Sequence, residues 1–263
     1  MDGTCTSSIQ GIPITQEWIY DSNNFDCSNA PFQISFTRNT QAKCILVIEK
    51  EGIYTRLSED RFYDPISSSS SSSSSSSHYP CILVTGRGFP DLATRAFVHT
   101  LYTHLNIPVI GICDCNPFGV SVLQTYEKGG EKMGYDATLY SVPVIWLGIR
   151  PSHIMELQER DYPSSKKKKK IKGMKEDNRN GTESSLLPGT VFQQMTELDY
   201  KRVNKLISIE REREENRDFE KIKELELMMA NGYKVELEAL HWLGMDYLTN
   251  WLAIQLKELT LLD

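Results

Sequence analysis

The strongest constraint on the fold is a set of four short apolar runs along the chain, each flanked by polar or glycine-rich sequence. They read "CILVIEK" (44–50), "CILVTGRGFPD" (81–91), "IPVIGIC" (107–113) and "VPVIWLG" (142–148). The apolar part of each run is too short for a helix and is typical of a buried strand. Because these strands are apolar on both faces and alternate with helical patterns, the sequence predicts an α/β fold: a mostly parallel sheet flanked by helices.

Local signals mark the helices between these strands. Asp91 is placed as the N-cap of the helix that follows it. Pro117 occupies the favoured first position of the next helix, and Gly129 provides its end. Both connections are therefore expected to be helical.

The last third of the chain is also expected to be helical. Thr196 opens a Thr-x-x-Asp pattern that resembles a capping box. Residues 211–232 are predicted to form a charged helix that ends at Gly232 and presents a solvated face. Residues 234–259 carry a strong apolar face at helical spacing.

Composition divides the chain into segments. Two tracts cannot bury apolar surface and are expected to be disordered inserts: the serine run Ser67–Ser77 and the lysine-rich stretch 161–190. The remaining segments are a short edge segment (1–43), an α/β domain (44–160) and a helical extension of that domain (191–263). The run Lys166–Lys170 fits a nuclear import signal, a nucleic-acid patch or a merely solvated loop.

Charge, hydropathy and cysteine spacing argue against a DNA-coating protein, a membrane protein and a zinc-binding protein. A formal net charge of −6 excludes a uniformly basic protein that coats DNA, although a local positive groove is compatible with it. We find no apolar run of membrane-spanning length and no signal peptide, so we expect the cytosol or the nucleus and no membrane partner. The cysteines are expected to be reduced and buried, and their single Cys-x-Cys spacing does not favour zinc; they are Cys5, Cys27, Cys44, Cys81, Cys113 and Cys115.

Acidic residues follow two of the predicted strands. Glu49 ends the first run, and Asp114 follows the third. Since the carboxyl ends of parallel strands share one rim, both carboxylates are expected there, and such a pair suits Mg²⁺ beside a phosphate. For Asp114 an ordinary role as the N-cap of the next helix is an equally open alternative, whereas Glu49 has no evident capping role.

Five motifs in order resemble one known family. They are "VIEKEGIYTRL", "ILVTGRGFPDLATR", "DCNPFGVSVLQTY", "WLG" and "KVELEAL". The chain is similar to the A subunit of topoisomerase VI and to its eukaryotic relative that makes the double-strand breaks of meiotic recombination. The resemblance implies a Toprim fold over residues 44–160 and a type IIB topoisomerase-like reaction, in which a tyrosine hydroxyl attacks a DNA phosphodiester with the help of magnesium.

The resemblance also implies roles for particular residues. Glu49 matches the family's first metal-binding glutamate and Asp114 the first aspartate of its Asp-x-Asp motif. Asn116 stands at the second aspartate and offers a neutral carbonyl oxygen, which implies single-metal or weaker magnesium binding. The glycine turn "GRGFPD" also matches the family, and Arg87, Gly88 and Arg95 are candidates for contact with DNA.

No tyrosine matches the family's nucleophile, which lies on a paired-tyrosine motif upstream of the Toprim domain. Tyr63 follows the first predicted helix and Tyr20 lies near the chain start, and neither fits that context. We therefore expect this chain to be the C-terminal portion of such a protein, inactive in cleavage alone. No Walker phosphate loop is found, so ATP hydrolysis would belong to a B-type partner.

The implied partners are duplex DNA, a second copy of the chain in a homodimer and a B-type partner protein. The implied location is the nucleus. Two other hypotheses remain open at this point. The chain could be a non-cleaving DNA-binding or dimerisation module or a truncated gene product, or it could be another Toprim enzyme such as a primase or nuclease.

Overall fold

The computed structural model describes residues 41–64, 78–130, 139–159, 187–213 and 217–260. The serine run, the lysine run, nearly all of the N-terminal edge segment and most of the 161–190 stretch lie outside these residues, so their predictions stay predictions.

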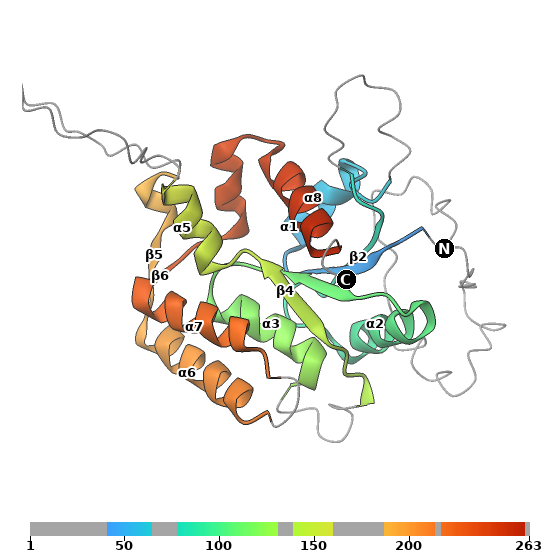
Figure 1. The fold of residues 1–263 in the computed structure, drawn as a ribbon, viewed down its shortest axis with the longest axis horizontal. Coiled ribbons are helices and arrows are strands. Elements are labelled where there is room, and N and C mark those ends of the chain that lie inside the picture. Colours follow the sequence, from blue (N-terminus) through green and yellow to red (C-terminus); the bar gives the residue numbers. More distant parts are fainter. Residues whose placement is uncertain (1–40, 65–77, 131–138, 160–186, 214–216, 261–263) are drawn as a thin grey trace, which may run out of the picture.

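The centre of the fold is a four-stranded sheet of order β2-β1-β3-β4, with every neighbouring pair parallel (Figure 1). Its strands are β1 (Cys44–Ile48), β2 (Cys81–Thr85), β3 (Val109–Ile112) and β4 (Val144–Gly148). All of β1 is buried, as expected for a central parallel strand that is covered on both faces. The four predicted strands and the α/β class are confirmed.

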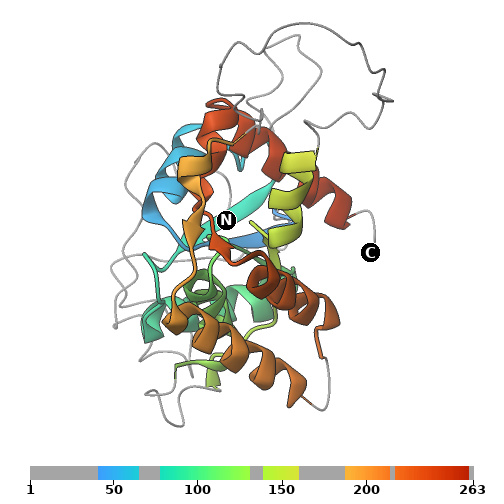
Figure 2. The same cartoon turned by 90° about the vertical axis from the view of Figure 1, so that its left-hand side faces the viewer.

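Helices cover both faces of the sheet. Figures 1 and 2 show α1 and α8 over one face and α2 and α3 over the other, while α6 and α7 lie beside α3 and α5 lies against α7. The helices are α1 (Glu51–Glu59), α2 (Leu92–Leu105), α3 (Pro117–Lys128), α5 (Pro151–Glu159), α6 (Glu197–Arg211), α7 (Phe219–Asn231) and α8 (Tyr247–Thr260). Short elements connect them: η4 (Gly189–Val191), β5 (Gln193–Gln194), β6 (Tyr233–Lys234) and η5 (Leu237–Leu243). Within the described part of the chain, no helix has the length and hydropathy needed to cross a membrane.

The local helix signals are confirmed. The Asp91 side chain accepts a hydrogen bond from the Thr94 backbone nitrogen at 2.7 Å and caps α2. Pro117 is the first residue of α3, which ends at Gly129. Thr196 and Asp199 form a complete capping box at the start of α6. These signals act within one turn of the backbone, so tertiary packing does not override them.

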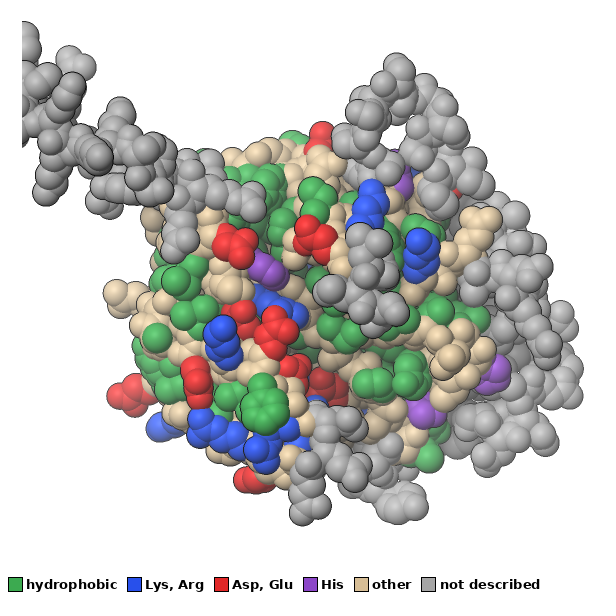
Figure 3. All heavy atoms as spheres, viewed as in Figure 1, with side chains coloured by type: hydrophobic (Ala, Val, Ile, Leu, Met, Phe, Trp, Pro, Cys, Tyr) green, Lys and Arg blue, Asp and Glu red, His purple; other side chains and the backbone are tan. Residues whose placement is uncertain are grey.

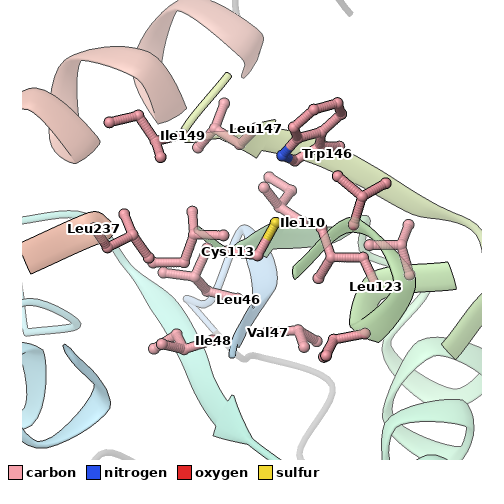
Figure 4. Close-up of a cluster of buried hydrophobic side chains, with 14 of the residues drawn as sticks. Leu46, Val47, Ile48, Ile110, Cys113, Leu123, Trp146, Leu147, Ile149 and Leu237 are labelled. Carbon is pink, nitrogen blue, oxygen red and sulfur yellow. The ribbon is translucent and has the colours of Figure 1, made fainter. Parts of the chain in front are cut away.

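One hydrophobic core joins the early and late parts of the chain. Figure 4 shows Leu46, Ile110 and Trp146 from the sheet together with Leu123 from α3 and Leu237 from η5. Leu237 is completely buried in the same cluster as the strands. The C-terminal residues therefore pack as part of the sheet's own core. The four cysteines within the described residues are free and buried, as predicted: Cys44, Cys81, Cys113 and Cys115.

The predicted continuous apolar helix over 234–259 is wrong. This segment consists of the end of β6, the 3-10 helix η5 and then α8. Gly244 ends η5 with a φ of 124°, a conformation that favours glycine and breaks helical periodicity. The apolar spacing is real, but it is shared between two elements that meet at a turn.

The prediction of a solvated charged helix over 211–232 also needs correction. The helix α7 starts only at Phe219, after the Asp218 N-cap, and Lys221 on it is almost completely buried. Arg213 and Lys221 contact Glu127 of α3 at 2.6 and 3.1 Å, and Arg213 contacts Glu210 at 2.8 Å. We call these four residues the ionic cluster. Opposite charges are paired there, which is the condition under which charged side chains are buried.

Figure 3 shows the outer side of this region, where acidic and basic side chains lie next to one another over α6 and α7 at the lower left. Here a charged sequence has both an exposed face and a buried, paired face. The spacing of apolar residues alone could not show which charged side chains are buried and which are exposed.

Removal of one partner from the ionic cluster should be strongly destabilising. Lys221→Met leaves the Glu127 carboxylate buried beside fewer positive charges, so we expect the free energy of unfolding to fall by about 3 kcal/mol or more. Urea denaturation measures this directly. The control Lys223→Met removes the same charge from an exposed position of α7 and should change stability by less than about 0.5 kcal/mol. Equal effects of the two variants would contradict the structural role of the cluster.

Candidate metal centre

The candidate site lies where the strand order reverses. The chain passes from β1 outward to β2 and then returns to place β3 on the other side of β1. At such a switch point the carboxyl ends of two adjacent strands diverge into a crevice that binds ligands in open α/β sheets. Glu49 directly follows β1, and its backbone nitrogen donates to the Ile112 carbonyl at 3.1 Å. Glu49 and Asp114 therefore lie on neighbouring strand ends, on the one rim expected from the sequence.

The Glu49 carboxylate points across the crevice to the β3 end. Its Oε2 accepts a hydrogen bond from the Asp114 backbone nitrogen at 2.9 Å. Burial raises the pKa of Glu49 from its ordinary 4.5 to about 7, against the opposing effect of this hydrogen bond. A carboxyl group of this pKa is poised to exchange its proton for a metal near neutral pH.

Asp114 is only 3% exposed, and both of its carboxylate oxygens are engaged. Oδ1 accepts from the Leu237 backbone nitrogen at 2.8 Å, and Oδ2 lies 3.0 Å from the Lys50 ammonium nitrogen. Burial is the largest effect on this carboxyl and raises its pKa, while the Leu237 hydrogen bond and Lys50 lower it.

Asn116, and not Asp114, caps the following helix. Its Oδ1 accepts from the Gly119 backbone nitrogen at 2.8 Å at the start of α3. The alternative in which Asp114 is an ordinary N-cap is therefore wrong. Asn116 still adjoins the site, because its Nδ2 lies 3.5 Å from Asp114 Oδ2. The capping bond occupies one lone pair of the carbonyl oxygen that was predicted to bind magnesium.

Sequence analysis missed the residues that complete the site from the far end of the chain. The Lys50 ammonium lies 2.7 Å from Glu238 and 3.3 Å from Glu236. These acids arrive because Val235 pairs with Cys115 in an isolated antiparallel bridge just beyond β3. The only signal was the motif "KVELEAL", which was matched to the family but given no role.

The three candidates for contact with DNA have different environments in the structure. Arg87 is exposed, has a φ of 54° and contacts Glu51 at 3.1 Å. Gly88, with a φ of 98°, donates its backbone N–H to the Glu49 carbonyl at 2.9 Å and so fastens the glycine turn to the site. Arg95 is completely buried, because it lies on the inward side of α2, and we remove it from the residues expected to meet DNA.

Tyr63 lies far from the acid pair. The carbonyl of the preceding residue, Phe62, accepts a hydrogen bond from the backbone nitrogen of Tyr79, which lies two residues before the first residue of β2. Tyr63 is therefore near the amino end of the sheet, whereas Glu49 is at the carboxyl end. Tyr20, the other tyrosine considered, lies outside the described residues.

The residues present fit a magnesium ion of the kind that binds through few protein ligands. Glu49 and Asp114 offer hard carboxylate oxygens, and the Lys50 ammonium shows that a positive charge is already stabilised beside Asp114. In the described ranges no three His, Cys, Asp or Glu side chains form a group that could hold a metal by themselves. Magnesium commonly uses one or two carboxylates and completes its shell with water and substrate phosphates, which matches this donor set.

A four-stranded parallel sheet with an acid pair at its switch point is consistent with a Toprim α/β domain, and comparison with known proteins shows that class. The family profile for the Toprim domain of Spo11 and of the topoisomerase 6 A subunit matches residues 44–187. The chain belongs to this family.

Individual relatives give the same result. The chain is 32% identical to "Meiotic recombination protein SPO11-2" of Oryza sativa subsp. indica, over 82% of this chain and 44% of the relative. It is also 32% identical to the A subunit of DNA topoisomerase 6 of Arabidopsis thaliana, over 83% and 42%. The same identity is found with "Meiotic recombination protein SPO11" of Homo sapiens, over 83% and 45%. The matched part of the chain thus covers less than half the length of these relatives. Glu236 and Glu238 lie beyond the part matched by the family profile.

A methyl group at Gly119 should disturb the site. A Cβ there would lie 2.8 Å from Glu49 Oε2, 2.8 Å from the Asp114 carbonyl oxygen and 3.0 Å from the Cys113 Cβ. We expect Gly119→Ala to lower the free energy of unfolding by about 1–3 kcal/mol in thermal melts. The matched control Gly52→Ala places its methyl group in open space on α1 and should be stabilising by up to about 1 kcal/mol. Stabilisation by both variants would contradict the close approach at Gly119.

The raised pKa of Glu49 predicts the sign of one pH dependence. The folded protein holds this proton more tightly than the unfolded chain, so the contribution to stability is full below about pH 4.5 and is lost as the pH rises to about 7. Its upper limit is roughly 3 kcal/mol, reduced by solvent screening at this half-buried group. Glu49→Gln should flatten the stability profile between pH 4.5 and 7 in EDTA, measured by urea denaturation. Glu59→Gln, on the exposed end of α1, should leave the profile unchanged. A profile for Glu49→Gln that is as steep as the native one would contradict the assignment.

Proposed function

We propose that this chain supplies the metal- and DNA-binding half of a type IIB topoisomerase-like reaction that forms DNA double-strand breaks in the nucleus during meiotic recombination. The observation that carries the proposal is the pairing of Glu49 with Asp114 at the switch point, in a chain of the family that contains Spo11 and the topoisomerase 6 A subunit. The names of the relatives, meiotic recombination proteins and part of a DNA topoisomerase, support the reaction class.

In this proposal Glu49 and Asp114 hold Mg²⁺. When bound, the ion supplies positive charge that binds phosphate oxygens and stabilises the charge that develops during transesterification. The rest of the site orients these two carboxylates: the Asp114 backbone nitrogen holds Glu49, and the Leu237 backbone nitrogen holds Asp114. Asn116 fixes the start of α3 and adds no charge, which favours a single ion.

Contact with DNA is assigned to the glycine turn. Arg87 projects from it with a side chain that is 73% exposed, and its partner Glu51 is also exposed. A phosphate oxygen can replace such a surface partner at little cost, because exposed ion pairs contribute less than about 1 kcal/mol. Gly88 contributes by holding the turn against the β1 end.

We assign the nucleophilic tyrosine to no residue of this chain. The proposed partners are duplex DNA, a second copy in a homodimer and an ATP-hydrolysing B-type protein. The second candidate function is a non-cleaving DNA-binding or dimerisation module. The observation that favours it is that no tyrosine among the 263 residues stands in the family's paired-tyrosine context.

Asp114→Asn should weaken Mg²⁺ binding by roughly tenfold or more, because it removes the charge of one of two protein ligands. Isothermal titration calorimetry with the 263-residue chain measures this, and Glu59→Gln serves as the charge-matched control. Duplex DNA binding in a gel-shift assay should be weakened but not lost, since basic side chains still neutralise phosphates. Unchanged Mg²⁺ affinity in Asp114→Asn would remove the metal site from the proposal.

The chain alone should form no covalent DNA adduct. After incubation with supercoiled DNA and Mg²⁺, denaturation in detergent should release only protein-free DNA. A 5′-tyrosyl-linked product that disappears in one Tyr→Phe variant would overturn this part of the proposal and identify the nucleophile.

A further inference from the structure

We propose that Lys50 is a tethered competitor of the divalent cation: its ammonium group and the metal bind the same oxygen of Asp114, and Glu236 and Glu238 hold the ammonium when the metal displaces it. The inference rests on the proposed metal site and adds to it a residue that sets cation affinity.

The competition follows from how Asp114 is held. Its Oδ1 accepts the Leu237 backbone N–H at 2.8 Å, a bond that also anchors the start of η5. The oxygen that already holds a positive charge is Oδ2, because the Lys50 Nζ lies 3.0 Å from it. A metal ion that approaches Oδ2 from the same side meets the ammonium and is repelled by its charge.

Lys50 is able to move without disturbing the fold. Its backbone is fixed between the end of β1 and the start of α1, where it occupies the N-cap position without a side-chain capping bond. Its side chain is 26% exposed and consists of a flexible four-carbon stem with a compact charge. Displacement therefore requires only new side-chain torsions.

The two glutamates offer the displaced ammonium a destination. Glu238 contacts Nζ at 2.7 Å and Glu236 at 3.3 Å, and their side chains are 43% and 51% exposed, toward the mouth of the site. A lysine ammonium is charged at neutral pH, so it needs these acids when it gives up Asp114.

Charge balance gives the cluster its attraction for a further cation. Three carboxylates, those of Asp114, Glu236 and Glu238, contact a single ammonium group. A divalent ion that takes Asp114 leaves Lys50 with two acidic partners, so every charge retains an opposite neighbour. The segment that carries Glu236 and Glu238 is thereby given a function in metal affinity, although neither residue is assigned as a metal ligand.

A double-mutant cycle on Mn²⁺ binding tests this. The probe is Mn²⁺ alone, titrated into the 263-residue chain at fixed pH and followed by electron paramagnetic resonance of the free ion. Lys50→Met should tighten Mn²⁺ binding on the order of tenfold, because the competitor is gone. Glu236→Gln/Glu238→Gln should weaken binding several-fold, because the ammonium then stays on Asp114. In the Lys50→Met background the same double substitution should have a clearly smaller effect, which comes only from the lost charge near the ion.

The controls separate the possible failures. Lys223→Met removes one positive charge from α7 at an exposed position and should leave affinity within about twofold of the native chain. Circular dichroism melts establish that each variant is folded before titration. Weaker or unchanged binding in Lys50→Met would overturn the proposal. It would also be overturned if the Glu236→Gln/Glu238→Gln effect were as large in the Lys50→Met background as in the native chain, since those acids would then act on the ion without Lys50. Native affinity in Asp114→Asn would instead show that the metal site itself is wrong.

Discussion

The pairing of β1 with β3 is the constraint on which the rest of the site depends. It sets the switch in strand order, and it brings the Glu49 backbone nitrogen to the Ile112 carbonyl. From there the Glu49 side chain reaches the Asp114 backbone nitrogen at 2.9 Å. If β3 did not neighbour β1, the two carboxylates would be separated by at least one more strand spacing of about 4.8 Å, and one ion could not bridge them.

Two buried carboxylates of this fold are held by partners from distant parts of the chain. Asp114 is held by Leu237 and Lys50, and Glu127 is held by Arg213 and Lys221. In both cases at least one partner comes from the C-terminal third of the chain, and Lys50 itself contacts Glu236 and Glu238 of that part. The C-terminal third is thus needed to hold the charges at the end of β3 and on α3, as well as for the apolar packing of the sheet. A functional unit that ended at the limit of the matched Toprim profile would lack the Leu237 hydrogen bond to Asp114.

The sequence predicted best those features that are decided within a few residues. The strands, the Asp91 cap, the Thr196 capping box and the ends of α3 all depend on local hydrogen bonds or on short apolar runs, and all are confirmed. Local sequence could not decide which residue caps α3, because Asp114 and Asn116 both stand before it. The hydrogen bond from the Gly119 backbone nitrogen shows that Asn116 is the cap. Arg95 was predicted to contact DNA because charged side chains are usually exposed, but it lies on the buried side of α2.

By itself, the sequence determined the α/β class, the family and the two acids at strand ends, because residue order and burial pattern carry that information along the chain. Only the tertiary structure decided that the Leu237 backbone nitrogen binds Oδ1 of Asp114 and the Lys50 ammonium binds Oδ2. It also decided that Glu236 and Glu238 contact the same ammonium. The physical reason is the separation of the partners: Lys50 and Glu238 are 188 positions apart and meet through the bridge between Cys115 and Val235. No periodicity or spacing rule reaches across that distance, so the environment of the acid pair becomes visible only when the chain is folded.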